Sequence, residues 1–117
     1  MSKANIPPAL LANVRGAVVD AVSAHLPREH VAPVCRALLD EEDGLPCALT
    51  VAYCGLPGEL RSEDRLLDLL AVHIDGILGT ETRAAGALRL RAHELRISAL
   101  ERELREEEAR LWRAERA

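Results

Sequence analysis

The last thirty residues, 88–117, constrain the fold of this chain more than any other feature. They include eight Arg and seven Glu, and they contain neither Gly nor Pro. An apolar residue returns at every seventh position, in the series Leu90, Ile97, Leu104 and Leu111. This pattern is typical of a long helix that has a solvated surface and one apolar edge. It therefore predicts a continuous amphipathic helix that can pair with another helix.

The apolar edge also predicts how the molecule meets a partner. Burial of one Leu or Ile side chain contributes roughly 1.5–3 kcal/mol, so we expect a second copy of the chain to cover the edge. Two alternatives are a helix that folds back as an ordinary core helix and a helix that captures a foreign partner. If His93 faces its own copy, assembly is expected to weaken at acidic pH. The predicted interface residues are Leu90, His93, Ile97, Leu100, Leu104, Leu111 and Trp112.

Composition favours a mainly all-α fold. Apolar residues make up 49% of the chain, but the only aromatic residues are Tyr53 and Trp112. The core must therefore be built from Leu, Val, Ile and Ala, whereas sandwiches and barrels usually draw on aromatic and β-branched residues. We expect a compact helical body over 1–82, followed by a long, coiled-coil-like amphipathic helix over 83–117.

Apolar stripes predict two helices in the first part of the chain. The first is expected to begin near Pro7 or Pro8, with Asn5 as the candidate N-cap, and to be ended by Pro27 because the residue before a proline avoids the α region. The second is expected over 28–42, where Asp43-Gly44 supplies a stop.

A third, strongly apolar helix is expected to begin near Ser62, whose hydroxyl can cap it, and to form the centre of the core. Between 76 and 82 the chain either breaks or continues. If it breaks, Thr80 or Thr82 caps the last helix, which then runs from about Arg83 to Arg116. Such a helix is roughly 50 Å long at 1.5 Å per residue. Because this exceeds the width of a compact domain of this size, part of it is expected to project or to pair with another chain.

Residues 47–54 allow two interpretations. Larger and smaller side chains alternate along this segment, as in a strand. Pro46 before it and Gly55 after it also suit a short helix. A strand needs a partner, and the chain contains no second convincing strand. We therefore interpret the segment as a short helix, with one short strand that pairs with its own copy as the alternative.

The sequence predicts no catalytic, cofactor-binding or metal-binding residues. His30 and the three cysteines, Cys35, Cys47 and Cys54, are the only set that resembles metal ligands. Zinc sites favour tight pairs such as Cys-x2-Cys, and no such pair is present. The simpler interpretation is free thiols near an exposed histidine.

Three acidic residues, Asp64, Asp68 and Asp75, share one face of the expected third helix. Such a group can act on a cation or as an acid/base pair, but a solvated acidic face is the simpler interpretation. The chain also lacks a Walker loop, a dinucleotide-binding fingerprint, a nucleophile elbow and a His-Glu-x-x-His motif. We therefore expect a protein that is not an enzyme.

One short segment of the chain resembles part of a known protein family. Residues 75–85 resemble the loop–helix signature of small peptidoglycan-binding repeats. The segment departs from that family at Leu78, where the family has an aromatic residue, and at Leu88-Arg89, where it has Phe-Gln. The loop that precedes the signature is also missing, so we do not assign the chain to this family.

Charge excludes some classes of function and favours others. The net charge is −4 overall, and it divides into −5 for residues 1–87 and +1 for the last thirty. Nucleic-acid-binding domains usually present a basic face, so nucleic acid is not the expected ligand. The longest uncharged run, 44–58, is too short to cross a bilayer, and the N-terminus lacks a signal-peptide core. We therefore expect a soluble cytoplasmic protein.

These observations favour a non-enzymatic interaction, adaptor or regulatory protein that acts as a homodimer. Fourteen of the fifteen basic residues are Arg, which is typical of GC-rich coding and suits a bacterial accessory or phage protein. A phage-encoded inhibitor whose acidic body competes for the basic surface of a host protein is a specific version. The alternatives are a DNA-binding regulator that uses the Arg-rich helix and a small zinc- or cysteine-dependent protein.

Overall fold

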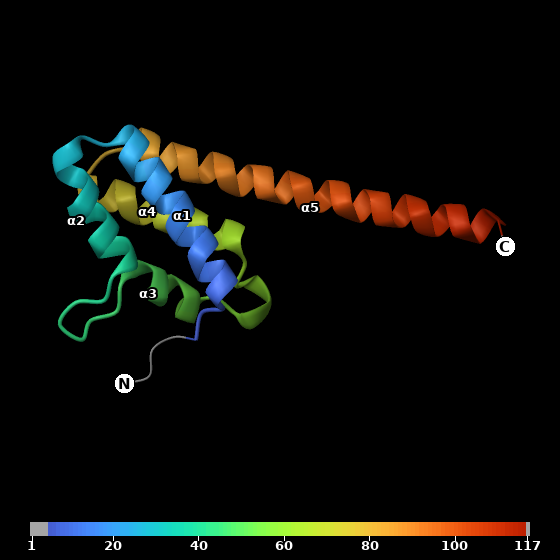
Figure 1. Ribbon diagram of the computed structural model, residues 1–117, viewed down its shortest axis with the longest axis horizontal. Helices are drawn as coiled ribbons and strands as arrows, with labels where there is room; N and C mark the ends of the chain where they lie inside the picture. The colour runs from blue at the N-terminus through green and yellow to red at the C-terminus, as the bar shows by residue number, and fades with distance from the viewer. Residues whose placement is uncertain (1–4, 117) are drawn as a thin grey trace.

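The computed structural model describes residues 5–116, and these residues form helices without any strand (Figure 1). The predicted all-α fold with a long C-terminal helix is confirmed. The first four residues of the predicted segment 1–82 and the last residue of the predicted segment 83–117 lie outside the described residues. The helices are α1 (Pro8–His25), α2 (Arg28–Leu39), α3 (Ala48–Gly55), a short 3-10 turn η1 (Gly58–Leu60), α4 (Glu63–Leu78) and α5 (Arg83–Arg116).

The observed ends of α1 and α2 show which residues determine where these helices begin and end. Pro27 ends α1 as expected, but Pro7 occupies the N-cap position and the predicted Asn5 cap is wrong. α2 ends at Leu39, three residues before the predicted end at 42. The run of acidic residues over 40–43 explains the early end, because negative charge is unfavourable at a helix C-terminus. Arg15 also stabilises this end, since its guanidinium donates to the Leu39 carbonyl at 3.1 Å.

The alternative of one short strand at 47–54 is wrong, because this segment forms α3. Its buried residues are Leu49 and Ala52, which are three positions apart and so follow the helical period rather than alternation. A helix satisfies its backbone groups internally, whereas a single strand would leave them without partners.

α4 is the central helix of the core. It packs against α1, α2, α3 and α5, and its buried side chains are Leu66, Leu67, Leu70, Ala71 and Ile74. The buried residues of the other helices are also Leu, Val and Ala, together with Cys47 before α3. The core is therefore aliphatic, as the composition indicated.

A tight connection between α4 and α5 reverses the direction of the chain. Gly79 ends α4 in the left-handed conformation with φ of 72°, which glycine adopts without the strain that a Cβ causes. Thr82 caps α5, because its hydroxyl accepts a hydrogen bond from the Ala85 amide at 3.0 Å. Of the two alternatives for 76–82, the chain therefore takes the break, with Thr82 as the cap of the last helix. The predicted Ser62 cap on α4 is wrong, since this side chain makes no capping hydrogen bond.

α5 belongs to the body over its first part only. Its buried residues are Ala84, Ala85, Leu88 and Ala92, and all lie in the first three turns. Every described residue from Glu101 to Arg116 is exposed, and Figure 1 shows this part of α5 extending well beyond the other helices. The longest dimension of the molecule is consequently 61 Å, against 34 and 19 Å for the others. Among the described helices, none has an apolar stretch sufficient to cross a membrane.

Candidate interaction surface

Interhelix ion pairs fix the position of α5 against α4. Arg96 donates from Nε to Asp64 at 2.7 Å and from Nη2 to Asp68. Arg89 donates from Nη2 to Asp75 at 2.9 Å. The three carboxylates therefore do not form a solvated acidic face, and that interpretation is wrong. They attach α5 to α4.

Asp75 joins the inter-helix loop to this network. Its Oδ1 accepts hydrogen bonds from the backbone N–H of Thr82 at 2.9 Å and from the Thr82 hydroxyl at 3.1 Å. Partial burial opposes ionisation of this carboxyl, but the bonds from Arg89 and Thr82 outweigh it and hold its pKa below the ordinary value. The pKa of Asp64 is also lowered, because hydrogen bonds with Ser62 and Arg96 outweigh the opposing effect of burial.

One sequence signal could have predicted these pairs. Asp68 and Asp75 are separated by seven residues, and so are Arg89 and Arg96. Two antiparallel helices bring such equally spaced groups together in both pairs at once. The signal was missed because the acidic residues were considered without the helix that follows them.

The predicted interface residues are all exposed. Leu104 is 62% exposed, Leu100 59%, Leu90 and Trp112 58%, Leu111 57% and Ile97 42%, and His93 is exposed as well. None of them packs into the core, so the alternative in which this edge folds back onto the body is not found in this structure. We use the name α5 ridge for the five aliphatic residues Leu90, Ile97, Leu100, Leu104 and Leu111.

The α5 ridge continues beside an exposed apolar part of α4. Two stripes with helical spacing are joined here by ion pairs. The stripe on α4 contains Asp68, Val72 and Asp75, and the stripe on α5 contains Arg89, His93 and Arg96. Val72 lies between the two paired aspartates on α4, and His93 lies between the two paired arginines on α5. Val72 is 61% exposed, and Leu69, one turn earlier on α4, is partly exposed too. The apolar surface thus spans both helices near the body and α5 alone beyond it.

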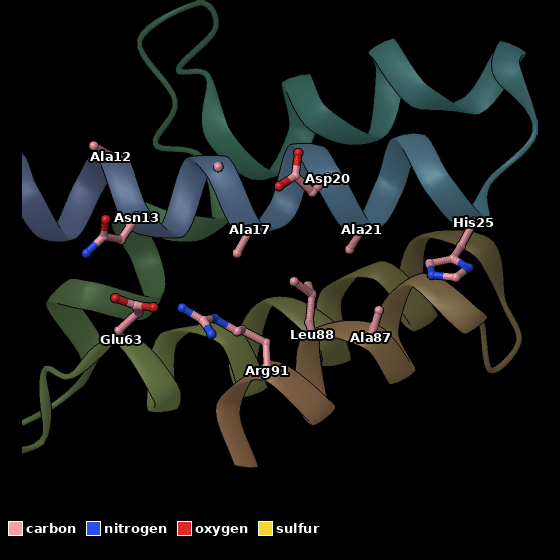
Figure 2. Close-up of a pocket in the computed structure, with 11 residues that line it drawn as sticks. Ala12, Asn13, Ala17, Asp20, Ala21, His25, Glu63, Ala87, Leu88 and Arg91 are labelled. Atoms are coloured by element: carbon pink, nitrogen blue, oxygen red, sulfur yellow. The ribbon is translucent and has the colours of Figure 1, made fainter. Parts of the chain in front are cut away.

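A groove of about 600 Å³ separates α1 from α5 on another side of the body (Figure 2). Figure 2 shows Glu63 and Arg91 pointing toward one another at one part of it. The lining includes no Ser, Thr, Cys or Lys, so it supplies no nucleophile of these types. The lining residues are Ala12, Asn13, Gly16, Ala17, Asp20, Ala21, His25, Glu63, Ala87, Leu88 and Arg91.

The cysteines occupy three different environments. Cys47 is buried, with its Sγ 3.4 Å from the Thr50 hydroxyl, whereas Cys54 is exposed. Cys35 is half-buried, and burial together with the charge of Asp40 raises the pKa of its thiol. A raised pKa opposes formation of the reactive thiolate. Among residues 5–116, no group of three or more His, Cys, Asp or Glu side chains is arranged to hold a metal ion.

No protein-family model, curated protein or solved structure matches this chain. Its function is therefore inferred from the surface that it presents.

Proposed function

We propose that this protein is a non-enzymatic interaction protein, adaptor or regulatory in kind, that acts as a homodimer joined through the α5 ridge. The observation that carries the proposal is the exposure of five large aliphatic side chains on one edge of a helix that extends beyond the body. Burial of each side chain contributes roughly 1.5–3 kcal/mol, which favours association strongly even after the entropic cost of joining two chains. A second copy carries the same edge with the same spacing, so it is the simplest partner.

Molar mass in solution tests the homodimer directly. We expect light scattering to give twice the chain mass of 12.8 kDa for the wild type. The variant Leu104→Arg places a charge in the middle of the α5 ridge and is expected to give the mass of one chain. Leu45→Arg is the matched control, because Leu45 is 70% exposed in a loop of the body and its replacement should leave the dimer intact. A wild type that stays monomeric at high concentration would overturn the proposal.

The same variants check that the effect is confined to assembly. Both altered residues are exposed and make no contribution to the core, so far-UV circular dichroism should show unchanged helix content. Equal loss of the dimer in both variants would mean that added positive charge, and not the α5 ridge, controls association.

We further propose that the dimer acts on a protein partner with a basic surface. Four consecutive acidic residues occupy 40–43 in the loop before α3, and all are exposed. Asp40 is paired with Arg15 and Glu42 with Arg36, which leaves Glu41 and Asp43 with no ion pair in the described structure. A bacterial or phage-encoded inhibitor that occupies a nucleic-acid-binding surface of a host protein is the specific version of this proposal. Attraction of this kind weakens as salt is added.

A comparison of charge variants tests the basic partner. Protein captured from a cytoplasmic extract of the native host should be released by high salt. Capture should also fall when Glu41→Gln and Asp43→Asn are combined, because these changes remove two charges from the loop. Glu106→Gln, in the extended part of α5, is the control and should leave capture unchanged. Capture that is insensitive to salt and to the double variant would contradict the basic partner.

The structure gives less support to the two alternatives. In α5, several Arg side chains already pair with carboxylates, including Arg89 and Arg96 with α4 and Arg110 with Glu107. These pairs reduce the positive charge available to a phosphate backbone. Among the described residues no group of His, Cys, Asp or Glu is arranged to hold a metal ion, and the pKa of the Cys35 thiol is raised, so neither zinc nor cysteine chemistry gains support.

A further inference from the structure

We infer that the two copies of α5 pair in parallel and in register, with both bodies at the same end of the dimer. This inference rests on the proposed homodimer and specifies its geometry. It is carried by the charges that flank the α5 ridge and by the order of polar and apolar residues in the seam. The seam is the face of α5 that is formed by residues 90, 93, 97, 100, 104, 107, 111 and 114.

Two series of residues, each repeating every seven positions, form the seam. The first series is entirely apolar and contains Leu90, Ile97, Leu104 and Leu111. The second series, three residues later, contains His93, Leu100, Glu107 and Ala114. In a parallel pair each series faces itself, whereas in an antiparallel pair each faces the other. Parallel pairing therefore keeps every member of the apolar series opposite another apolar residue, and antiparallel pairing sets His93 and Glu107 against Leu or Ile.

Two further series flank the seam, one on each side. On one side all four residues are acidic, namely Glu94, Glu101, Glu108 and Glu115. On the other side three of the four are basic, namely Arg89, Arg96, Glu103 and Arg110. In a parallel pair each residue of the second series faces the residue five positions later in the partner.

Parallel pairing matches these flanks by charge. It brings opposite charges together in three of the four cases, Arg89 with Glu94, Arg96 with Glu101 and Arg110 with Glu115. Only Glu103 meets a like charge, at Glu108 of the partner. In an antiparallel pair each flank faces its own kind, so the four glutamates on one side face only glutamates. Charge complementarity therefore selects the parallel arrangement.

The intramolecular pairs are compatible with this arrangement. Arg89 and Arg96 each already donate to carboxylates of α4, but a guanidinium has five N–H donors and can serve a second acceptor. Glu107, which faces its own copy in the seam, is hydrogen-bonded by Arg110 of the same helix. The bodies are both acidic, but their charges are dispersed over solvated surface and screened beyond about 8–10 Å. The charges beside the seam act at contact distance.

Oxidative cross-linking distinguishes the two directions. Leu111→Cys, made in a Cys54→Ser background to remove the exposed native thiol, should yield disulfide-linked dimers on a non-reducing gel, because residue 111 faces its own copy only in parallel pairs. Arg102→Cys, which lies on the outer side of the same helix, is the control for random collision and should yield little. A mixture of His93→Cys with Leu111→Cys cross-links between the two variants only if the helices run antiparallel.

The outcomes separate the two proposals. Self-cross-linking of Leu111→Cys above the Arg102→Cys control supports the parallel dimer. A dimer by light scattering in which only the mixed pair cross-links would overturn the parallel geometry and leave the homodimer in place. A single-chain mass for the wild type would overturn both.

A charge change gives a second measure that needs no cysteine. Glu103→Arg converts the like-charge contact of a parallel pair into an attractive one, so the dissociation constant should fall by roughly threefold or more. In an antiparallel pair Glu103 faces the partner's largely basic flank, and the same change should raise the dissociation constant. Glu106→Arg, an exposed charge outside the seam, is the matched control for net charge.

Discussion

Asp75 and Arg89 lie fourteen residues apart in the sequence, and their side chains meet across the α4–α5 connection with Nη2 and Oδ2 separated by 2.9 Å. The same carboxylate accepts two hydrogen bonds from Thr82, the residue that caps α5. One side chain thus links the end of α4, the loop and the first turns of α5.

Asp75→Asn should lower the free energy of unfolding at pH 7 by about 1 kcal/mol, because the charge that pairs with Arg89 is removed while an acceptor for Thr82 remains. The pKa of Asp75 is lowered in the folded state, so its contribution is complete above the ordinary value near 3.9 and disappears as the pH falls through the lower folded value. Urea unfolding at pH 7 and near pH 3 should therefore show a difference between variant and wild type that is larger at pH 7. An equal difference at both pH values would contradict this assignment.

Arg96→Gln should reduce stability by about 1 kcal/mol or somewhat more. Arg96 pairs with two carboxylates, and its loss leaves Asp64 and Asp68 as like charges one turn apart on α4. Arg102→Gln is the matched control, since Arg102 is exposed in the extended part of α5. Thermal unfolding that changes equally in the two variants would mean that the bridge between α4 and α5 contributes nothing beyond surface charge.

Gly79→Ala and Gly16→Ala should change stability in opposite directions. Gly79 has φ of 72°, and a side chain in this conformation is strained, so alanine should cost about 1 kcal/mol. Gly16 lies inside α1, where a Cβ would meet no atom within 4 Å, so alanine should stabilise the helix by roughly 0.5–1 kcal/mol. Urea unfolding of both variants gives the signs, and a stabilising Gly79→Ala would contradict the left-handed turn.

His93→Leu should strengthen self-association. His93 is exposed in the seam beside Leu90 and Ile97, and a leucine there adds one more apolar layer to the dimer. Because each buried Leu contributes roughly 1.5–3 kcal/mol, we expect the dissociation constant to fall at least tenfold in sedimentation equilibrium. His73→Leu, at an exposed position on α4 outside the seam, should change it little. Similar effects of both substitutions would argue against a specific seam.

The glycines illustrate how a local pattern can be misread without the fold. Gly76, Gly79 and Gly86 would fall on one face of a continuous helix, which could allow close approach of two backbones, whereas a flexible break between two helices is the simpler interpretation. In the structure the helix breaks at Gly79, and a Cβ at any of the three would have nothing within 4 Å. Only Gly79 has a conformational role, so the alignment has no meaning for packing within the body.

The sequence by itself determined the helices other than α3 and the apolar edge of α5, and it left the break before Arg83 as one of two alternatives. These features follow from interactions between residues a few positions apart: proline at a helix boundary, the Thr82 cap, and apolar side chains at helical spacing. The tertiary structure decided which surfaces are covered. It showed that Asp64, Asp68 and Asp75 hold α5 through two arginines, that α3 is a helix, and that α5 leaves the body after its first turns. Such outcomes depend on contacts between segments distant in sequence, and a local pattern cannot specify which of several possible neighbours a side chain meets.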